Sequence, residues 1–197
     1  PGVREAQPRM RFAFPSSGRG GRAIFGRDVG AGEIPADGID DALVRAELGE
    51  ACGFVGPEAR SGGRACVDDS ACADGERCEF ASIPRAGAQA QGGRCALPIP
   101  VVLSPFLIEI FNGTIAPAHR LPRVGDALIQ RATGVVFEWD LGRAGLGSAR
   151  QGTPRRVHAR LVGVSRHAMD LGVSVPLSVA RRLNREYAGE AWAEKFS

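Results

Sequence analysis

Two segments in the C-terminal half of the chain, residues 134–141 and 156–164, alternate apolar and polar residues. A period of two is typical of a strand that buries one face. We therefore predict two strands that pair with their apolar faces on the same side, joined by a loop, residues 142–153, that is too long for a tight hairpin. The apolar positions are Val135, Phe137 and Trp139 in the first segment and Val157, Ala159 and Leu161 in the second.

Three segments show helical spacing next to recognisable start and stop signals. An Asp-Asp pair precedes a short apolar pattern that ends at Gly49, which predicts a helix with acids at its positive end. Ser104 is followed by proline, a combination of preferred N-cap and preferred first helical residue, and predicts a helix that stops at Asn112. A third helix is predicted over residues 176–187.

The remaining strand signals are shorter. Residues 10–14 and 22–25 are strand-like runs separated by the turn-rich residues 16–21, which predicts a hairpin or two neighbouring strands. Residues 97–102 form an apolar run that predicts a buried strand, and the segment 115–122 is predicted to be a loop.

The order of these elements predicts an α+β fold with a mixed sheet, short packed helices and a disulfide-rich loop insertion. Residues 1–50 and 96–197 are predicted to form one core domain. Residues 51–95 are predicted to be a cysteine-rich insertion in that domain.

The insertion holds all five cysteines of the chain. Zinc sites usually present paired cysteines separated by two to four residues, whereas the gaps after Cys66 are five, five and sixteen residues. The spacing therefore favours disulfides and an oxidising compartment. We predict the pairs Cys66–Cys78 and Cys72–Cys95 with Cys52 left free, while a Cys52–Cys66 bridge stays open as an alternative.

Acidic residues between these cysteines could offer oxygens to a calcium ion. Asp68, Asp69, Asp74 and Glu76 lie within one short stretch, but their spacing lacks the regular alternation of an EF-hand loop. We expect a solvated acidic turn and no bound metal, with a calcium site as the weaker alternative.

Composition narrows the class of protein. With 44% hydrophobic and 24% charged residues, the chain is expected to fold around a core. Prolines interrupt the longest apolar stretch, so no membrane-spanning helix is expected. Of the 25 basic residues, 24 are arginine, because Lys195 is the one lysine, and they occur singly or in pairs. This scattered distribution of arginines, together with only 6% aromatic residues, does not favour nucleic-acid binding. The chain starts at Pro1 without an initiator Met, which suggests a segment of a longer protein or a processed product.

The residues that most often carry catalysis lack the expected partners. His119, His158 and His167 are far apart, and none has a metal-ligating partner at helical spacing. Ser104 and Ser165 are not in a G-x-S-x-G motif, and Ser104 already has a capping role. We therefore predict that the chain is not an enzyme and needs no cofactor.

The half of the chain from Ile99 to Ser197 resembles the extracytoplasmic domain of FtsX/MacB-type ABC transporter permeases. The resemblance rests on an order of elements: a Ser-Pro helix ending in Asn, an Ala-Pro loop leading to Leu-Pro, and strands closing on Leu-Gly and on Val-Gly-Val-Ser. A Gly-Val-x-Val-Pro-Leu helix start follows. The cysteine-rich segment departs from the common pattern of this family.

The resemblance implies a domain on the periplasmic side of a bacterial inner membrane that does no chemistry. Such a domain engages a substrate or partner protein and transmits conformational change. Its implied partners are the transmembrane helices of the same permease, a cytoplasmic ATPase subunit acting indirectly, and a periplasmic partner protein or lipophilic substrate. The chain has no Walker loop for ATP hydrolysis of its own. The alternative is a stand-alone secreted or periplasmic binding module stabilised by disulfides.

Overall fold

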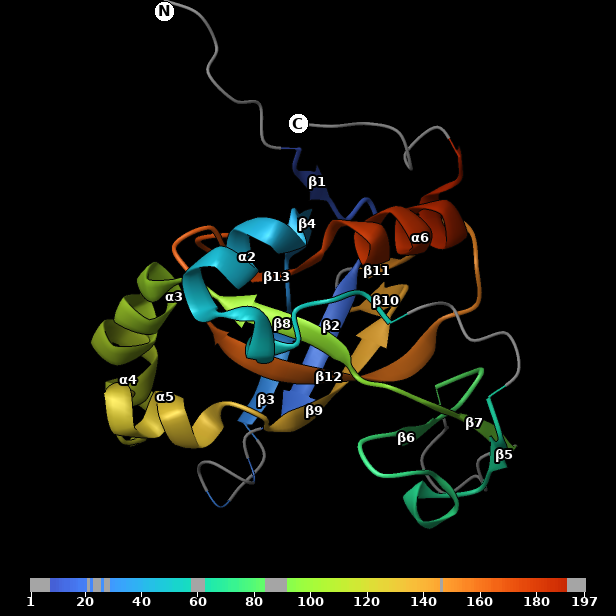
Figure 1. The fold of residues 1–197 in the computed structure, drawn as a ribbon, viewed down its shortest axis with the longest axis horizontal. Helices are drawn as coiled ribbons and strands as arrows, with labels where there is room; N and C mark the ends of the chain where they lie inside the picture. Colours follow the sequence, from blue (N-terminus) through green and yellow to red (C-terminus); the bar gives the residue numbers. More distant parts are fainter. Residues whose placement is uncertain are drawn as a thin grey trace, which may run out of the picture.

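An eight-stranded mixed sheet is the centre of the fold (Figure 1). The computed structural model describes residues 8–20, 22, 26, 29–57, 63–83, 92–145 and 147–190. The strand order is β1-β4-β13-β8-β12-β9-β2-β3, with β4 parallel to β13 and β8 parallel to β12. The strands are β1 (Met10–Arg11), β2 (Ser16–Gly20), β3 (Val29–Glu33), β4 (Ala36–Ile39), β8 (Ile99–Leu103), β9 (Val136–Leu141), β12 (Arg155–Val164) and β13 (Val173–Pro176).

The sheet curls until its two ends meet. Strand β3 is eighth in the order and β4 is second, so in a flat sheet they would lie about 29 Å apart. Ile34 and Pro35 alone connect them, and three Cα steps span at most about 11 Å. The backbone N–H of Ile34 donates to the Ser16 carbonyl, and that of Phe12 donates to the Ala36 carbonyl, both at 2.9 Å. Residues 10–20 and 29–39 therefore form one bent ribbon that joins both ends of the sheet.

Helix α6 (Leu177–Ala188) covers one face of the sheet over the larger hydrophobic cluster. Its Leu183 and Tyr187 are fully buried, and so is Trp139 on β9. The register pairs Val157 with Trp139 and Ala159 with Phe137, which confirms the predicted pairing of these two apolar faces. Trp139 is the deeply buried ring of its strand, while Phe137 is only partly buried.

Helix α2 (Asp41–Leu48) covers the opposite face. On β8, Val101 belongs to the larger cluster and Val102 to a second one, because successive side chains point to opposite sides of a strand. Val44 of α2 and Phe54 pack in this second cluster. The helix begins as predicted, since the Asp40 carboxylate accepts from the N–H of Ala42, and its C-cap is Gly49.

Residues 105–132 form a helical lobe on one side of the sheet, which we call the arm (Figure 1). Ser104 caps it as predicted, its hydroxyl accepting from the N–H of Leu107 at 3.0 Å. The predicted stop at Asn112 is wrong, and the loop predicted over 115–122 is wrong for residues 115–119, because the chain stays helical to His119. The Asn112 side chain instead bonds to both backbone polar groups of Val124. The arm consists of α3 (Pro105–Ile110), the π-helix η3 (Phe111–Ile115), α4 (Ala116–His119) and α5 (Asp126–Ala132).

The N-terminal hairpin prediction is also wrong. The serine and glycine run expected as a turn is strand β2, which pairs with β9 and β3. Gly18 lies close to the Ile34 side chain, whose Cδ1 atom would have to move if a Cβ atom, 2.2 Å away, were added at this position. Apart from Arg22, the predicted strand over residues 22–25 lies outside the described residues.

A second, three-stranded sheet contains three of the five cysteines and lies on the side of the molecule away from the arm (Figure 1). With this sheet and its disulfides, the predicted fold class is confirmed. The division into a core domain and an insertion at residues 51–95 stays a prediction. The sheet has the order β5 (Ala65–Cys66), β7 (Gly93–Ala96), β6 (Arg77–Glu79). The other short elements are the 3-10 helices η1 (Glu50–Cys52) and η2 (Asp69–Ala71) and a hairpin of β10 (Arg143–Ala144) and β11 (Gly147–Ser148) within the predicted loop.

Candidate functional site

Residues 63–83 and 92–96, which we call the disulfide unit, contain both predicted cross-links. Cys66 is bonded to Cys78 and Cys72 to Cys95, which confirms the favoured pairing. Cys52 is a free, half-buried thiol. The sulfur atoms themselves form the centre of this unit's small hydrophobic cluster, so the cross-links replace a core of large side chains.

The acidic residues of the unit cap its own turns. Asp68 accepts from the N–H of Ser70 at 2.9 Å, and hydrogen bonds from that residue lower the pKa of Asp68. Asp69 accepts from the N–H of Cys78 at 2.8 Å. The carboxylate of Glu76 accepts from the N–H of Ala73 three residues earlier, at 3.2 Å.

These carboxylates therefore have structural partners, and they do not gather around a common point. Within the described residues, the group of metal-ligating atoms that does converge consists of sulfur atoms of Cys66, Cys72 and Cys95. All three are in disulfides, which leaves them without a thiolate to bind metal. Asp74 is exposed on the same turn.

The disulfide unit contacts the main sheet through a polar interface. The Glu79 carboxylate accepts from the backbone N–H of His158 at 3.1 Å, and Phe80 forms a β-bridge with Arg156. Burial raises the pKa of Glu79 to about 7, and burial lowers the pKa of His158. The Nδ1 atom of His158 is buried without a hydrogen-bond partner in the described structure. His158 thus lies beneath the unit, which covers the polar face of β12 at this position.

The other candidate catalytic residues stay apart. His119 ends α4 in the arm. The Ser165 hydroxyl donates to Glu47 and accepts from the N–H of His167 at 3.1 Å, so it closes a turn. Ser104 caps α3. The structure does not bring these side chains together with His158 into a nucleophile and base pair.

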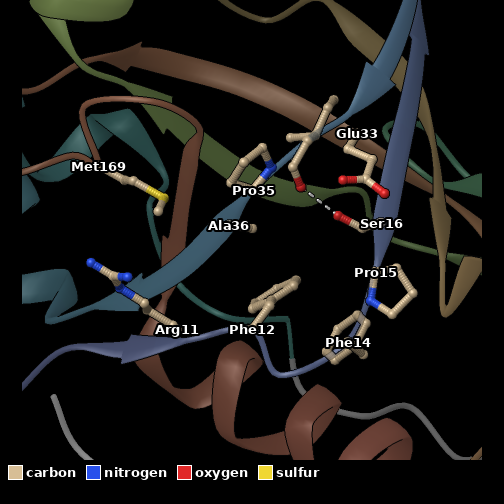
Figure 2. Close-up of a pocket in the computed structure, with 10 residues that line it drawn as sticks. Arg11, Phe12, Phe14, Pro15, Ser16, Glu33, Pro35, Ala36 and Met169 are labelled. Carbon is tan, nitrogen blue, oxygen red and sulfur yellow. Dashed lines mark hydrogen bonds between the residues drawn. The ribbon is translucent and has the colours of Figure 1, made fainter. Parts of the chain in front are cut away.

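A cavity of about 280 Å³ opens at the bend of the ribbon (Figure 2). The two links of the ribbon differ in length here, with four residues between β1 and β2 and two between β3 and β4. Phe12 and Phe14 lie side by side, with Arg11 and Met169 to one side of the view and Glu33 and Ser16 to the other. The lining residues are Arg11, Phe12, Phe14, Pro15, Ser16, Glu33, Ile34, Pro35, Ala36 and Met169.

The aromatic wall of this cavity is fixed from behind. The Phe12 ring stacks on Phe14 with centroids 4.7 Å apart and on Trp139 at 5.6 Å, and Phe14 packs at 4.7 Å against Tyr187. The Ser16 hydroxyl donates to the Ile34 carbonyl at 2.7 Å. The cavity is therefore a preformed apolar surface with charged groups at its border. No motif in the sequence indicated it, because its walls come from two separate links of the ribbon.

A buried carboxylate lies next to this cavity. Asp37 on β4 is opposite Arg11 in the ladder, accepts from the Ser174 hydroxyl and forms an ion pair with Arg9 at 3.3 Å. Burial raises the pKa of Asp37. This cluster was also missed by sequence analysis, because Asp37 is more than 25 positions from both arginines and 137 positions from Ser174.

Comparison of the chain with protein families, with curated proteins and with solved structures finds no match. None of the helices in the described ranges is both long and apolar enough to cross a membrane.

Proposed function

We propose that this chain is a non-catalytic extracytoplasmic domain of an ABC transporter permease of the FtsX/MacB type. In this proposal the domain engages a substrate or partner protein on the periplasmic side of a bacterial inner membrane. Its motion is coupled to transmembrane helices of the same permease and, through them, to a cytoplasmic ATPase subunit.

The observation that carries the proposal is the contact between the first and last described elements. The Asn184 side chain of α6 accepts from the N–H of Ala13 at 3.0 Å and donates to the Arg11 carbonyl at 2.8 Å. The chain thus approaches β1 and leaves α6 at one pole, as a domain held by two membrane helices requires. The disulfide unit lies away from that pole (Figure 1).

Two further features support the same proposal. Disulfides form and persist outside the reducing cytoplasm, which agrees with a periplasmic position. The curled sheet joins the pole of β1 and α6 to the disulfide unit through β12 and β8, so it can transmit displacement between them as one packed body.

The second candidate is a stand-alone disulfide-stabilised binding module, which the preformed cavity favours. Membrane fractionation of the full gene product distinguishes the two. The permease proposal predicts a product that stays in the inner-membrane pellet after alkaline carbonate extraction. A product recovered in the soluble periplasmic or secreted fraction would overturn the permease proposal and support the binding module.

A further inference from the structure

We propose that the cavity at the ribbon bend binds a small amphipathic anion, meaning one aromatic ring or a short alkyl chain that carries a carboxylate, and that Arg11 receives the carboxylate. This inference goes beyond the proposed function, because it names a ligand class for the cavity that neither candidate function specifies.

The size and lining of the cavity define the apolar part of the ligand. Small-molecule sites usually start at about 300 Å³, so a cavity of about 280 Å³ fits a ligand smaller than a typical drug. Phe12 offers a half-buried ring whose orientation Trp139 and Phe14 already fix. Little ordering is therefore required when an apolar group enters.

The charges define the polar part. Within the described residues, the Arg11 guanidinium forms no ion pair, in contrast to Arg9 on the same segment. Asp37 attracts Arg11, but one of its oxygens accepts from Ser174 and the other pairs with Arg9. Arg11 therefore keeps planar N–H donors that suit a carboxylate.

Arg11 fixes the orientation of the ligand. Figure 2 shows Arg11 across the cavity from Ser16 and Glu33. An anionic head is attracted at the Arg11 side. The apolar part then lies over Phe12 and Phe14, where the wall is aromatic.

Isothermal titration with octanoate and with its neutral analogue octanamide tests the proposal. We expect octanoate to bind the oxidised chain at millimolar concentration or below, and at least about tenfold more tightly than octanamide. Arg11→Gln should abolish this preference while octanamide binding is retained. The matched control Arg143→Gln, an exposed arginine outside the lining, should keep it.

A second variant tests the location without disturbing the aromatic core. Met169 is partly exposed at the border of the cavity, so Met169→Trp should fill the cavity and weaken binding of both ligands at least tenfold. Equal affinity of the unchanged chain for octanoate and octanamide would overturn the proposal. So would a preference that survives Arg11→Gln, binding that survives Met169→Trp, or no octanoate binding up to about 10 mM.

Discussion

The disulfide unit and the arm are both appended to the curled sheet, and they are held together in different ways. The unit has a cluster of three buried cysteines and two cross-links. In the arm, Ala116 and Ala132 are the described residues that are buried, and Phe106 is 46% exposed. The unit therefore depends on covalent constraint, whereas the arm depends on partly exposed apolar contacts and on caps.

Because of this difference, we expect different kinds of substitution to destabilise the disulfide unit and the arm. A segment that cannot bury enough apolar surface must reduce the entropy of its unfolded state, which a disulfide does. The arm instead satisfies backbone groups with side chains, since Ser104 caps its start and Asn112 binds Val124. We expect loss of a cross-link to damage the unit more than loss of any one apolar side chain damages the arm.

The largest effect is expected from Cys72→Ser combined with Cys95→Ser. Removing a native disulfide from a small unit typically costs about 2 to 5 kcal/mol. Hydrogen exchange of residues 63–83 should accelerate accordingly, while exchange of α6 stays unchanged. Cys52→Ser is the matched control and should leave the hydrogen exchange of both segments unchanged. Equal acceleration in α6 would show that the unit and the sheet unfold together.

A smaller effect is expected from pH at the interface between the unit and the sheet. The pKa of Glu79 in the folded chain, about 7, lies above its ordinary value of 4.5. Its stabilising contribution is therefore complete below pH 4.5 and is lost as pH rises through about 7, with an upper limit of about 3 kcal/mol. For His158, whose pKa is lowered, the contribution is present above pH 6.5 and is lost on acidification.

Denaturant titrations of the unchanged chain and of Glu79→Gln, each at pH 4.5, 7 and 8.5, isolate the contribution of Glu79. Glu79→Gln should remove most of the decline in unfolding free energy between pH 4.5 and pH 7. Asp74→Asn, on an exposed turn of the same unit, should not. A decline that is the same in Glu79→Gln and the unchanged chain would contradict the role of Glu79.

The next largest effect on stability is expected at the N-cap of the arm. Ser104→Ala removes the oxygen that accepts from Leu107 and should cost about 1 kcal/mol in unfolding free energy. Ser104→Asp should restore most of the loss, because aspartate is also a good N-cap. If both variants are equally destabilised, the bond from the Ser104 hydroxyl to the Asp170 carbonyl is the more important contact.

The smallest effect is expected at the exposed surface of the arm. Phe106→Ser should lower the unfolding free energy by much less than loss of a fully buried side chain, because 46% of the residue is already exposed. Thermal melts of Phe106→Ser and of Leu183→Ala should be compared, because Leu183→Ala leaves a cavity at a fully buried site and shows how large the loss of stability is there. A loss at Phe106 comparable to that at Leu183 would mean that the arm has a tighter core than its burial indicates.

Local signals were sufficient for several elements of this fold. Asp40 and Ser104 mark helix starts that the structure reproduces, and the period of two in β9 and β12 indicated both strands and their shared apolar face. Cysteine spacing favoured the observed pairing. Each of these depends on residues close together in sequence or on one repeating pattern.

The features that escaped prediction depend on distant contacts. Gly18 is read as a turn residue from its neighbours, but it lies in a strand because β9 and Ile34 pack against it. His158 looks like a surface residue until Glu79, 79 positions earlier, covers it. The cavity likewise requires the sheet to curl, which no short pattern specifies.

The central proposal is that this chain lies on the periplasmic side of the inner membrane and is attached to it through transmembrane helices. Gln130 is exposed on α5, so Gln130→Cys in a Cys52→Ser background provides one accessible thiol in the described part of the chain. The full gene product with this reporter should be labelled by a membrane-impermeant maleimide while the inner membrane is intact, and the labelled product should remain in the carbonate-washed membrane pellet. Labelling that requires disruption of the inner membrane, or a labelled product in the soluble fraction, would contradict the account.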